Sequence, residues 1–234
     1  MCGRYILHGP VSRYRDYFDA RNLDSFDLSY NVAPSQVKPV VRRSAAGGRD
    51  FVLARWGFIP ARTTDPAGSP QPINAKCETA AIKAMFRDAF RSRRVLVPAD
   101  GFYEWQPQPG QRKQPYLIRL TDGSPMGLAG LLECWHGPEG DLWTFTVLTT
   151  DANPLVAPIH SRMPAIIAPE DFDRWLDPSV SDIEELHGML GPYPDRLMQA
   201  YTVSSKVSSP DNDGPDLIEP VEASDVGETR SLFE

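Results

Sequence analysis

The chain begins Met1-Cys2-Gly3-Arg4-Tyr5, and removal of Met1 would leave Cys2 as a free N-terminal 1,2-aminothiol. With ordinary pKa values of about 8.5 for a thiol and about 7.7–8.0 for an α-amine, both groups are partly nucleophilic near neutral pH. The amine can form a Schiff base with an aldehyde, and the sulfur can then close a thiazolidine ring, which is more durable than an imine. No internal cysteine can do this. The alternative is that Cys2 is an incidental small residue.

Three other segments place polar, reactive residues at the ends of predicted strands or in loops. They are Asn74-Ala75-Lys76-Cys77-Glu78-Thr79, Ala99-Asp100-Gly101-Phe102-Tyr103-Glu104-Trp105 and His160-Ser161-Arg162-Met163-Pro164. Two more segments, residues 30–34 and 55–60, combine aromatic residues with a turn. Each pattern is weak alone. Their occurrence together, in this order and behind a second-position cysteine, is specific.

These segments resemble the SRAP family, the SOS response-associated peptidases or abasic-site processing proteins, from residue 2 to about residue 207. The resemblance implies a DNA-damage function in which single-stranded DNA is bound and the ring-opened aldehyde of an abasic (AP) site is captured by the N-terminal cysteine. It implies AP-site lyase-like activity and no cofactor. It identifies the catalytic residues as Cys2, Asn74, Glu104 and His160.

The resemblance also places DNA contacts at two arginines, Arg4 and Arg162. A third contact is expected at Lys76, where many relatives carry arginine, although lysine lacks the bidentate guanidinium fork. Phosphates require lysine or arginine, and unstacked bases require flat platforms, for which Trp56 and Trp105 are the candidates. Single-stranded DNA is favoured over duplex because stacking shields the sugar carbon that the aminothiol must reach.

Thiazolidine formation needs a base for the α-ammonium and an acid that expels water. Glu104 lies between Tyr103 and Trp105, and apolar surroundings that raise a carboxyl pKa towards neutrality would suit it to both roles. His160 can transfer protons near neutral pH and could protonate the sugar ring oxygen as it opens. Asn74 can hold the sugar or the amine through its amide. The alternatives are an outward-facing strand glutamate, a histidine that caps a turn and a loop asparagine.

Composition excludes several classes of protein. The three cysteines (Cys2, Cys77 and Cys134) show no CxxC spacing, and the four histidines form no HxH or HxxxH pair, so neither a disulfide framework nor a metal site is predicted. Cys77 and Cys134 are expected to be core thiols. The apolar runs are strand-sized and charges follow Cys2 at once, so we expect a cytoplasmic protein without a signal peptide, membrane span or membrane contact, associated with the nucleoid when it binds DNA.

Charge divides the sequence into two halves. The net charge is −7, but residues 1–113 hold 18 Lys+Arg against 10 Asp+Glu (net +8), and the remainder holds 6 against 21 (net −15). This asymmetry indicates a surface that faces a polyanion, or an ordinary surface of uneven composition.

The periodicity predicts an α+β fold with a mixed, mostly antiparallel, partly closed β-sheet and peripheral helices, because strands do not alternate regularly with helices. Strands are expected at residues 3–9, 37–43, 51–55, 94–97, 101–105, 116–120, 126–135, 142–149 and 197–203. Helices are expected at residues 11–22, 77–92, 169–176 and 181–190. Residues 1–207 should form one SRAP-like domain, and residues 208–234 an acidic, flexible tail.

The sequence is also consistent with two other functions. Cys2, His160 and Glu104 could form a thiol peptidase that removes Met1 or cleaves other peptides. A non-catalytic single-stranded DNA-binding module would rely on charge alone. The chain is expected to act as a monomer, and the apolar pair Leu232 and Phe233 near its end suggests a contact with a sliding clamp.

Overall fold

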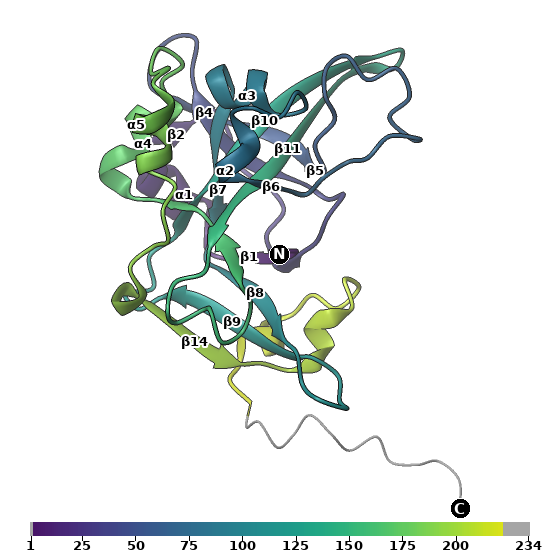
Figure 1. Cartoon of the computed structure of the whole chain (residues 1–234), viewed down its shortest axis with the longest axis vertical. Helices are drawn as coiled ribbons and strands as arrows, with labels where there is room; N and C mark the ends of the chain where they lie inside the picture. The colour runs from purple at the N-terminus through teal and green to yellow at the C-terminus, as the bar shows by residue number, and fades with distance from the viewer. Residues whose placement is uncertain (1, 222–234) are drawn as a thin grey trace, which may run out of the picture.

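The computed structural model describes residues 2–221, which form two β-sheets with short helices around them (Figure 1). The predicted class, α+β with a mixed and partly closed sheet, is confirmed. Within the described residues no helix is long and apolar enough to cross a membrane.

The smaller sheet has five antiparallel strands in the order β14–β9–β8–β1–β3. Their bounds are Met198–Thr202 (β14), Gln114–Leu120 (β9), Gly101–Gln106 (β8), Arg4–Leu7 (β1) and Ser29–Val32 (β3). The strand that follows Cys2 is therefore an inner strand, hydrogen-bonded on both sides, and it lies at the centre of the molecule (Figure 1).

The larger sheet runs β12–β11–β10–β7–β4–β5–β2, with β13 paired to β10 and β6 paired to β11. The strands are Arg162–Pro164 (β12), Gly140–Asp151 (β11), Met126–Gly137 (β10), Arg94–Ala99 (β7), Val37–Arg43 (β4), Arg49–Trp56 (β5), Ala20–Arg21 (β2), Ile166–Ile167 (β13) and Asn74–Lys76 (β6). A parallel pairing of β11 with β5 closes five of these strands into a ring.

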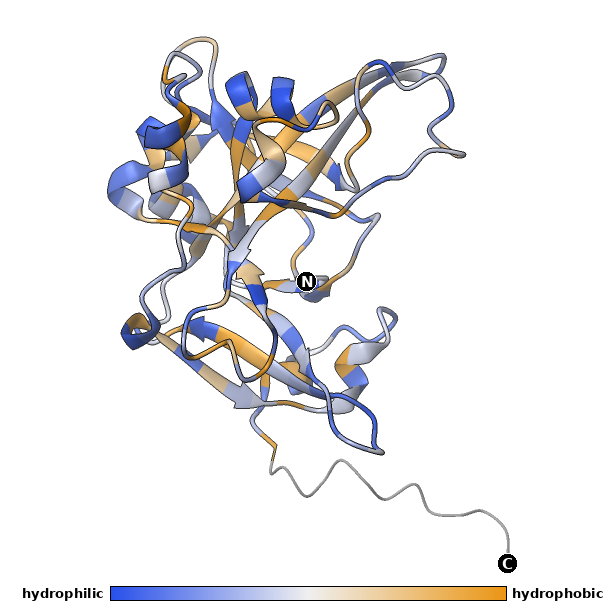
Figure 2. Ribbon diagram, in the orientation of Figure 1, coloured by the Kyte–Doolittle hydropathy of each residue, from blue (hydrophilic) through white to orange (hydrophobic). Residues whose placement is uncertain are grey.

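Helices occupy the periphery, where Figure 2 shows mostly polar residues, while apolar residues follow the central strands. The α-helices are α1 (Val11–Phe18), α2 (Cys77–Ala80), α3 (Arg87–Ser92), α4 (Phe172–Leu176) and α5 (Ile183–Gly188). The 3-10 turns are η1 (Pro169–Asp171), η2 (Asp195–Leu197), η3 (Ser205–Ser208) and η4 (Pro215–Ile218).

Two predicted helices are shorter than expected. The helix predicted at residues 77–92 is broken into α2 and α3, because the intervening turns direct Phe86 into the core against Phe58, with ring centroids 5.3 Å apart. The helix predicted at residues 11–22 ends at Phe18, because Asp19 adopts a left-handed conformation with φ of 43°. The hydrophobic period alone does not register such chain reversals.

The folded domain extends beyond the predicted boundary at residue 207. Leu217, on η4, is 1% exposed and packs in a second apolar cluster with residues of the smaller sheet. The Asn31 side chain donates to the carbonyls of Ser209 and Asn212, both at 2.9 Å. Polar composition predicted a tail from residue 208, but a single buried leucine and these backbone contacts hold residues 208–221 in place. Leu232 and Phe233 lie outside the described residues.

Candidate active site and nucleic-acid interface

Cys2 is fully buried where the two sheets meet, and its thiol donates to the carbonyl of Arg4 at 3.7 Å. It belongs to the main hydrophobic cluster rather than to the surface. Burial raises the pKa of the Cys2 thiol far above its ordinary value, and the negative charge of Glu104 raises it further. The thiol is therefore protonated at neutral pH.

Glu104 lies on β8, directly beside the start of the chain. The antiparallel register of β1 with β8 pairs Arg4 with Tyr103, so Glu104 continues β8 alongside the residues that precede Arg4. Glu104 is 2% exposed, and burial raises the pKa of its carboxyl, while positive charges that include His160 oppose the shift. The expectation that apolar surroundings would perturb this carboxyl agrees with the structure. A carboxyl of raised pKa can both accept and donate a proton near neutrality.

Asn74 begins β6, a short strand that pairs in parallel with β11. Its side-chain amide donates to the backbone carbonyl of Cys2 at 2.8 Å. The other amide atom, Oδ1, is buried without a hydrogen-bond partner among the described residues. A buried, unsatisfied acceptor is costly in a folded protein, so this oxygen is available to a hydroxyl or ammonium donor brought by a substrate or by the chain terminus.

His160 follows the turn of residues 153–159 and precedes β12. Its Nδ1 lies 3.0 Å from the backbone nitrogen of Arg162 and 3.1 Å from the carbonyl oxygen of the same residue. When the ring is neutral, Nδ1 can accept a hydrogen bond from the backbone N–H of Arg162. When the ring is protonated, Nδ1 can donate one to the Arg162 carbonyl oxygen. In both states the ring is held in place, and the neutral ring carries its proton on Nε2.

The four predicted catalytic residues are thus brought into one neighbourhood from four distant segments. Asn74 contacts Cys2 directly, Glu104 acts electrostatically on Cys2, and His160 acts electrostatically on Glu104. Among the described residues, the one group of side chains whose metal-ligating atoms lie close together is elsewhere, at the end of the β10–β11 hairpin.

Two tryptophans were predicted to stack on DNA bases, and the prediction for Trp56 is wrong. It is fully buried, donates from Nε1 to the carbonyl of Ile73 at 2.8 Å and stacks on Phe145, so no base can reach it. It is a core residue because β5 enters the closed ring at this point. Trp105 is half-buried and donates from Nε1 to the Ser208 hydroxyl at 3.0 Å, which fixes the ring at the surface of β8.

The two predicted DNA-contacting arginines differ in their partners. Arg4 is half-buried and hydrogen-bonds to two backbone carbonyls, those of Gly3 at 3.0 Å and Ser208 at 3.5 Å, and no carboxylate of the described residues pairs with it. Burial lowers the pKa of its guanidinium from a very high ordinary value. The positive charge of Arg4 is held in place without being neutralised.

Arg162 is instead held by acids. Its guanidinium makes a bidentate pair with Glu78 at 2.6 and 2.9 Å and a further ion pair with Asp151 at 2.6 Å. These partners raise the pKa of Arg162, and Arg162 lowers the pKa of Glu78. A phosphate that approaches Arg162 must compete with the Glu78 carboxylate for the same two guanidinium NH groups.

Lys76 is exposed at the end of β6, beside a cavity of about 510 Å³ whose walls include Pro70, Asn74 and Lys83. The cavity adjoins the site through Asn74 and presents two lysines, which suits a phosphate-bearing chain. Sequence reasoning missed Lys83, which it placed within a continuous helix, and the role of Glu78. The signal for Glu78 was its position inside the reactive segment itself, four residues after Asn74.

The SOS response associated peptidase (SRAP) family matches residues 1–210. The chain belongs to this family. It is 40% identical to the abasic site processing protein YoqW of Bacillus subtilis, over 94% of this chain and 99% of that protein. It is 30% identical to the abasic site processing protein HMCES of Gallus gallus, over 95% of this chain and 78% of that protein.

Solved structures agree with the assignment to the SRAP family. A protein from Bacteroides thetaiotaomicron superposes with a TM-score of 0.83 at 26% identity, covering 95% of this chain and all of that one. A protein from Bordetella bronchiseptica gives a TM-score of 0.75 at 27% identity, over 87% of this chain. The resemblance inferred from the sequence motifs is therefore confirmed.

Proposed function

We propose that this SRAP protein binds single-stranded DNA and captures AP sites covalently through a thiazolidine formed by the aminothiol of Cys2. The observation that carries the proposal is the position of Cys2, in contact with Asn74 and within the electrostatic influence of the buried Glu104. The names of its relatives, abasic site processing proteins, give the class of substrate.

The chemistry balances with the loss of one water. After Met1 is removed, the α-amine attacks the aldehyde carbon of the ring-opened sugar to give a carbinolamine, from which water leaves to form an imine. The thiol then adds across the C=N bond, with sulfur bonding to carbon and the thiol proton passing to nitrogen. Glu104 is suited to take the ammonium proton and to return one to the departing hydroxyl. His160 is suited to protonate the ring oxygen of the closed sugar.

Burial, which raises the pKa of the Cys2 thiol, favours attack by the amine before the thiol. A protonated thiol is a poor nucleophile, so the amine attacks first and ring closure requires a nearby base. The imine is also the species from which strand cleavage by elimination proceeds, which accounts for the lyase-like activity. Closure to the thiazolidine removes that risk and shields the lesion during replication and the SOS response.

DNA is held in this proposal by cations around the site. Arg4 and Lys76 offer phosphate contacts without a competing carboxylate among the described residues, and Arg162 joins them once Glu78 is displaced. Trp105 offers the remaining aromatic surface. The protein acts as a monomer in the cytoplasm, on the nucleoid, with single-stranded DNA as its partner.

The direct test is denaturing electrophoresis of the purified protein with an AP-site oligonucleotide and with the same oligonucleotide intact. We expect a heat-stable 1:1 adduct with the AP-site DNA alone, from a protein whose intact mass shows Met1 removed. An active crosslinker that retains Met1, or equal adducts with intact DNA, would contradict the proposal.

A thiol peptidase is the second candidate, and the word peptidase in the family's name favours it. The burial of Cys2 weighs against it, because thiol peptidases use a thiol whose pKa is lowered. Reductive methylation of the mature α-amine, with the thiol protected reversibly, separates the two chemistries. Crosslinking should be lost, whereas peptide cleavage by the thiol should survive. A non-catalytic DNA-binding module would retain every activity as Cys2→Ala.

A further inference from the structure

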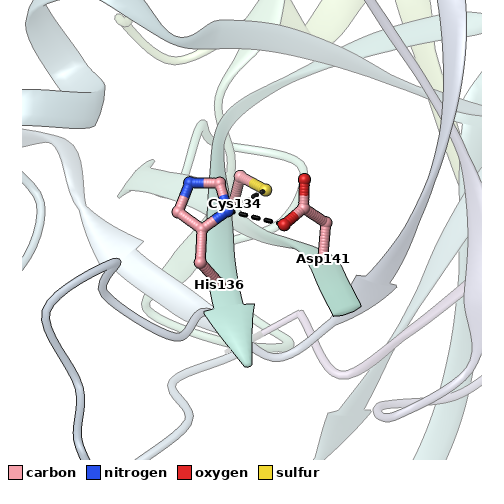
Figure 3. A group of neighbouring side chains, drawn as sticks. All are labelled: Cys134, His136 and Asp141. Carbon is pink, nitrogen blue, oxygen red and sulfur yellow. Dashed lines mark hydrogen bonds and ion pairs between the residues drawn. The ribbon is translucent and has the colours of Figure 1, made fainter. Parts of the chain in front are cut away.

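A second cysteine, Cys134, lies near the open end of the β10–β11 hairpin on the same strand face as His136. The two residues are separated by one position, so their side chains project from the same side of β10. The antiparallel register places Asp141 of β11 directly opposite His136. The three side chains point toward one another (Figure 3).

The distances in this trio are close to those of a metal site. The Cys134 sulfur lies 3.9 Å from Nδ1 of His136, and the same nitrogen lies 2.6 Å from Oδ1 of Asp141. All three potential ligand atoms lie within 4.8 Å of one another. Tetrahedral zinc, with Zn–S of about 2.3 Å and Zn–N or Zn–O of about 2.0 Å, requires separations of about 3.6 Å for S···N and about 3.3 Å for N···O.

For the S···N and N···O pairs, changes of less than about 1 Å would convert one arrangement into the other. The side chains of His136 and Asp141 are 70% and 59% exposed, so they can make this adjustment without disturbing the core. We propose that Cys134, His136 and Asp141 bind one zinc ion. Sulfur, imidazole nitrogen and carboxylate oxygen are the donors that zinc takes in proteins.

The fourth position of the zinc ion is open to water. Cys134 and His136 also line a cavity of about 750 Å³, which gives a water molecule room to complete the tetrahedron. Binding replaces the proton shared by His136 and Asp141 and releases the thiol proton of Cys134. The site should therefore bind zinc more weakly as the pH falls.

The backbone around the trio is firmly held. The Glu133 carboxylate accepts from the backbone nitrogen of Cys134 at 3.1 Å and pairs with Arg93 at 2.8 Å. On the opposite face, Trp135 donates from Nε1 to the carbonyl of Thr63 at 2.7 Å. Two ligands on one anchored strand and a third from its paired partner make the geometry largely preformed, which lowers the ordering cost of binding.

The proposed ion has a structural role, separate from the Cys2 chemistry. Asp141 precedes Val147, the residue of β11 that pairs with Asn74, by six positions. At about 3.3 Å per residue this corresponds to about 20 Å along the strand. An ion at the hairpin end would join its two strands and would not contact the substrate.

The experiment uses cobalt(II) as a spectroscopic probe in the Cys2→Ala protein, because a free N-terminal aminothiol would itself bind metal. Cobalt should give a thiolate charge-transfer band with a stoichiometry of one per chain, and zinc should abolish the band by competition. Cys134→Ser should remove the band. His136→Ala and Asp141→Asn should each weaken binding by at least about tenfold.

Two matched controls keep the test decisive. Cys77→Ser removes another buried thiol, and Glu139→Gln removes another acid of the same hairpin, and both should keep the band. Zinc should raise the melting temperature of the Cys2→Ala protein more than that of the His136→Ala variant in the same background. A band that is absent, or that survives Cys134→Ser, would overturn the proposal whether or not AP-site capture is confirmed.

Discussion

A cysteine, a carboxylate and a histidine occur together twice in this protein, and their surroundings make them chemically different. At the centre, Cys2 and Glu104 are buried, and burial raises the pKa of both groups. At the hairpin end, the side chains of His136 and Asp141 are mostly exposed and already paired with each other. The first setting favours proton transfer to and from a nucleophile, and the second favours ligands that share a cation.

The two trios also differ in their assembly. Cys2, Glu104 and His160 come from separate segments and are brought together by the smaller sheet and by the turn before β12. The hairpin trio is local, because one register of two adjacent strands places all its members on one face. A site that depends on the whole fold can be excluded from water, whereas a site on one hairpin remains accessible.

The largest predicted contrast is between the two cysteines. Cys2→Ala should abolish the heat-stable adduct with AP-site DNA, because it removes the sulfur that closes the ring. Cys134→Ser should leave the amount and rate of adduct unchanged within about twofold, since Cys134 lies far from the proposed site. Gel quantification of both variants under one set of conditions checks the contrast. Equal loss in both variants would show that the two regions are coupled.

The second contrast compares the two carboxylates. Glu104→Gln should slow adduct formation by roughly 10²–10⁴-fold with little change in affinity for intact single-stranded DNA, because it removes a proton carrier and no phosphate contact. Asp141→Asn should leave the rate unchanged. Single-turnover rates and separate binding titrations provide the comparison. A parallel loss of rate and affinity in Glu104→Gln would refute the acid–base role.

The free energy of unfolding should also distinguish Glu104 from Asp141, because removing the charge of Glu104 should stabilise the protein at neutral pH and removing that of Asp141 should not. Burial raises the pKa of Glu104 from 4.5, so its ionisation costs stability as pH rises from that value through the raised one. Glu104→Gln should therefore match the wild type most closely near pH 4 and be the more stable protein at pH 7. Asp141→Asn, which loses an exposed ion pair, should lose at most about 1 kcal/mol. Denaturant unfolding at both pH values measures these differences.

Much of the site around Cys2 could be predicted from the sequence, because its chemistry depends on residue types that can be recognised in their local segments. The strand periodicity gave β8, and aromatic neighbours on both sides of Glu104 indicated its burial. Periodicity could not show that β5 enters a closed ring, so Trp56 was assigned to the surface. Closure depends on the pairing of β5 with β11, residues about ninety positions apart.

The hairpin trio escaped sequence reasoning for a related reason. Searches for metal sites rely on two ligands at fixed spacing along one segment, and the third ligand here comes from the partner strand. Cys134 was expected to be a core thiol, and it is indeed buried. Its sulfur nevertheless faces a histidine and borders a cavity, which no local pattern reveals.

The smallest predicted effect concerns Arg162. Its ion pairs with Glu78 and Asp151 offset the positive charge that it would otherwise present to DNA. Glu78→Gln weakens the bidentate pair, so a phosphate no longer has to displace a full negative charge. Affinity for intact single-stranded DNA should rise by up to about fivefold at 0.1 M salt, with a slope of log affinity against log salt steeper by up to about 0.7.

Glu184→Gln on α5 is the matched control for this change in charge, and it should alter neither quantity. Fluorescence anisotropy at several salt concentrations measures both. If Glu78→Gln lowered the affinity, the carboxylate would be orienting Arg162 towards the DNA rather than competing with it. The Arg162–Glu78 pair would then be part of the DNA-binding surface. Arg4, which hydrogen-bonds to backbone carbonyls and pairs with no carboxylate of the described residues, would still be available to a phosphate.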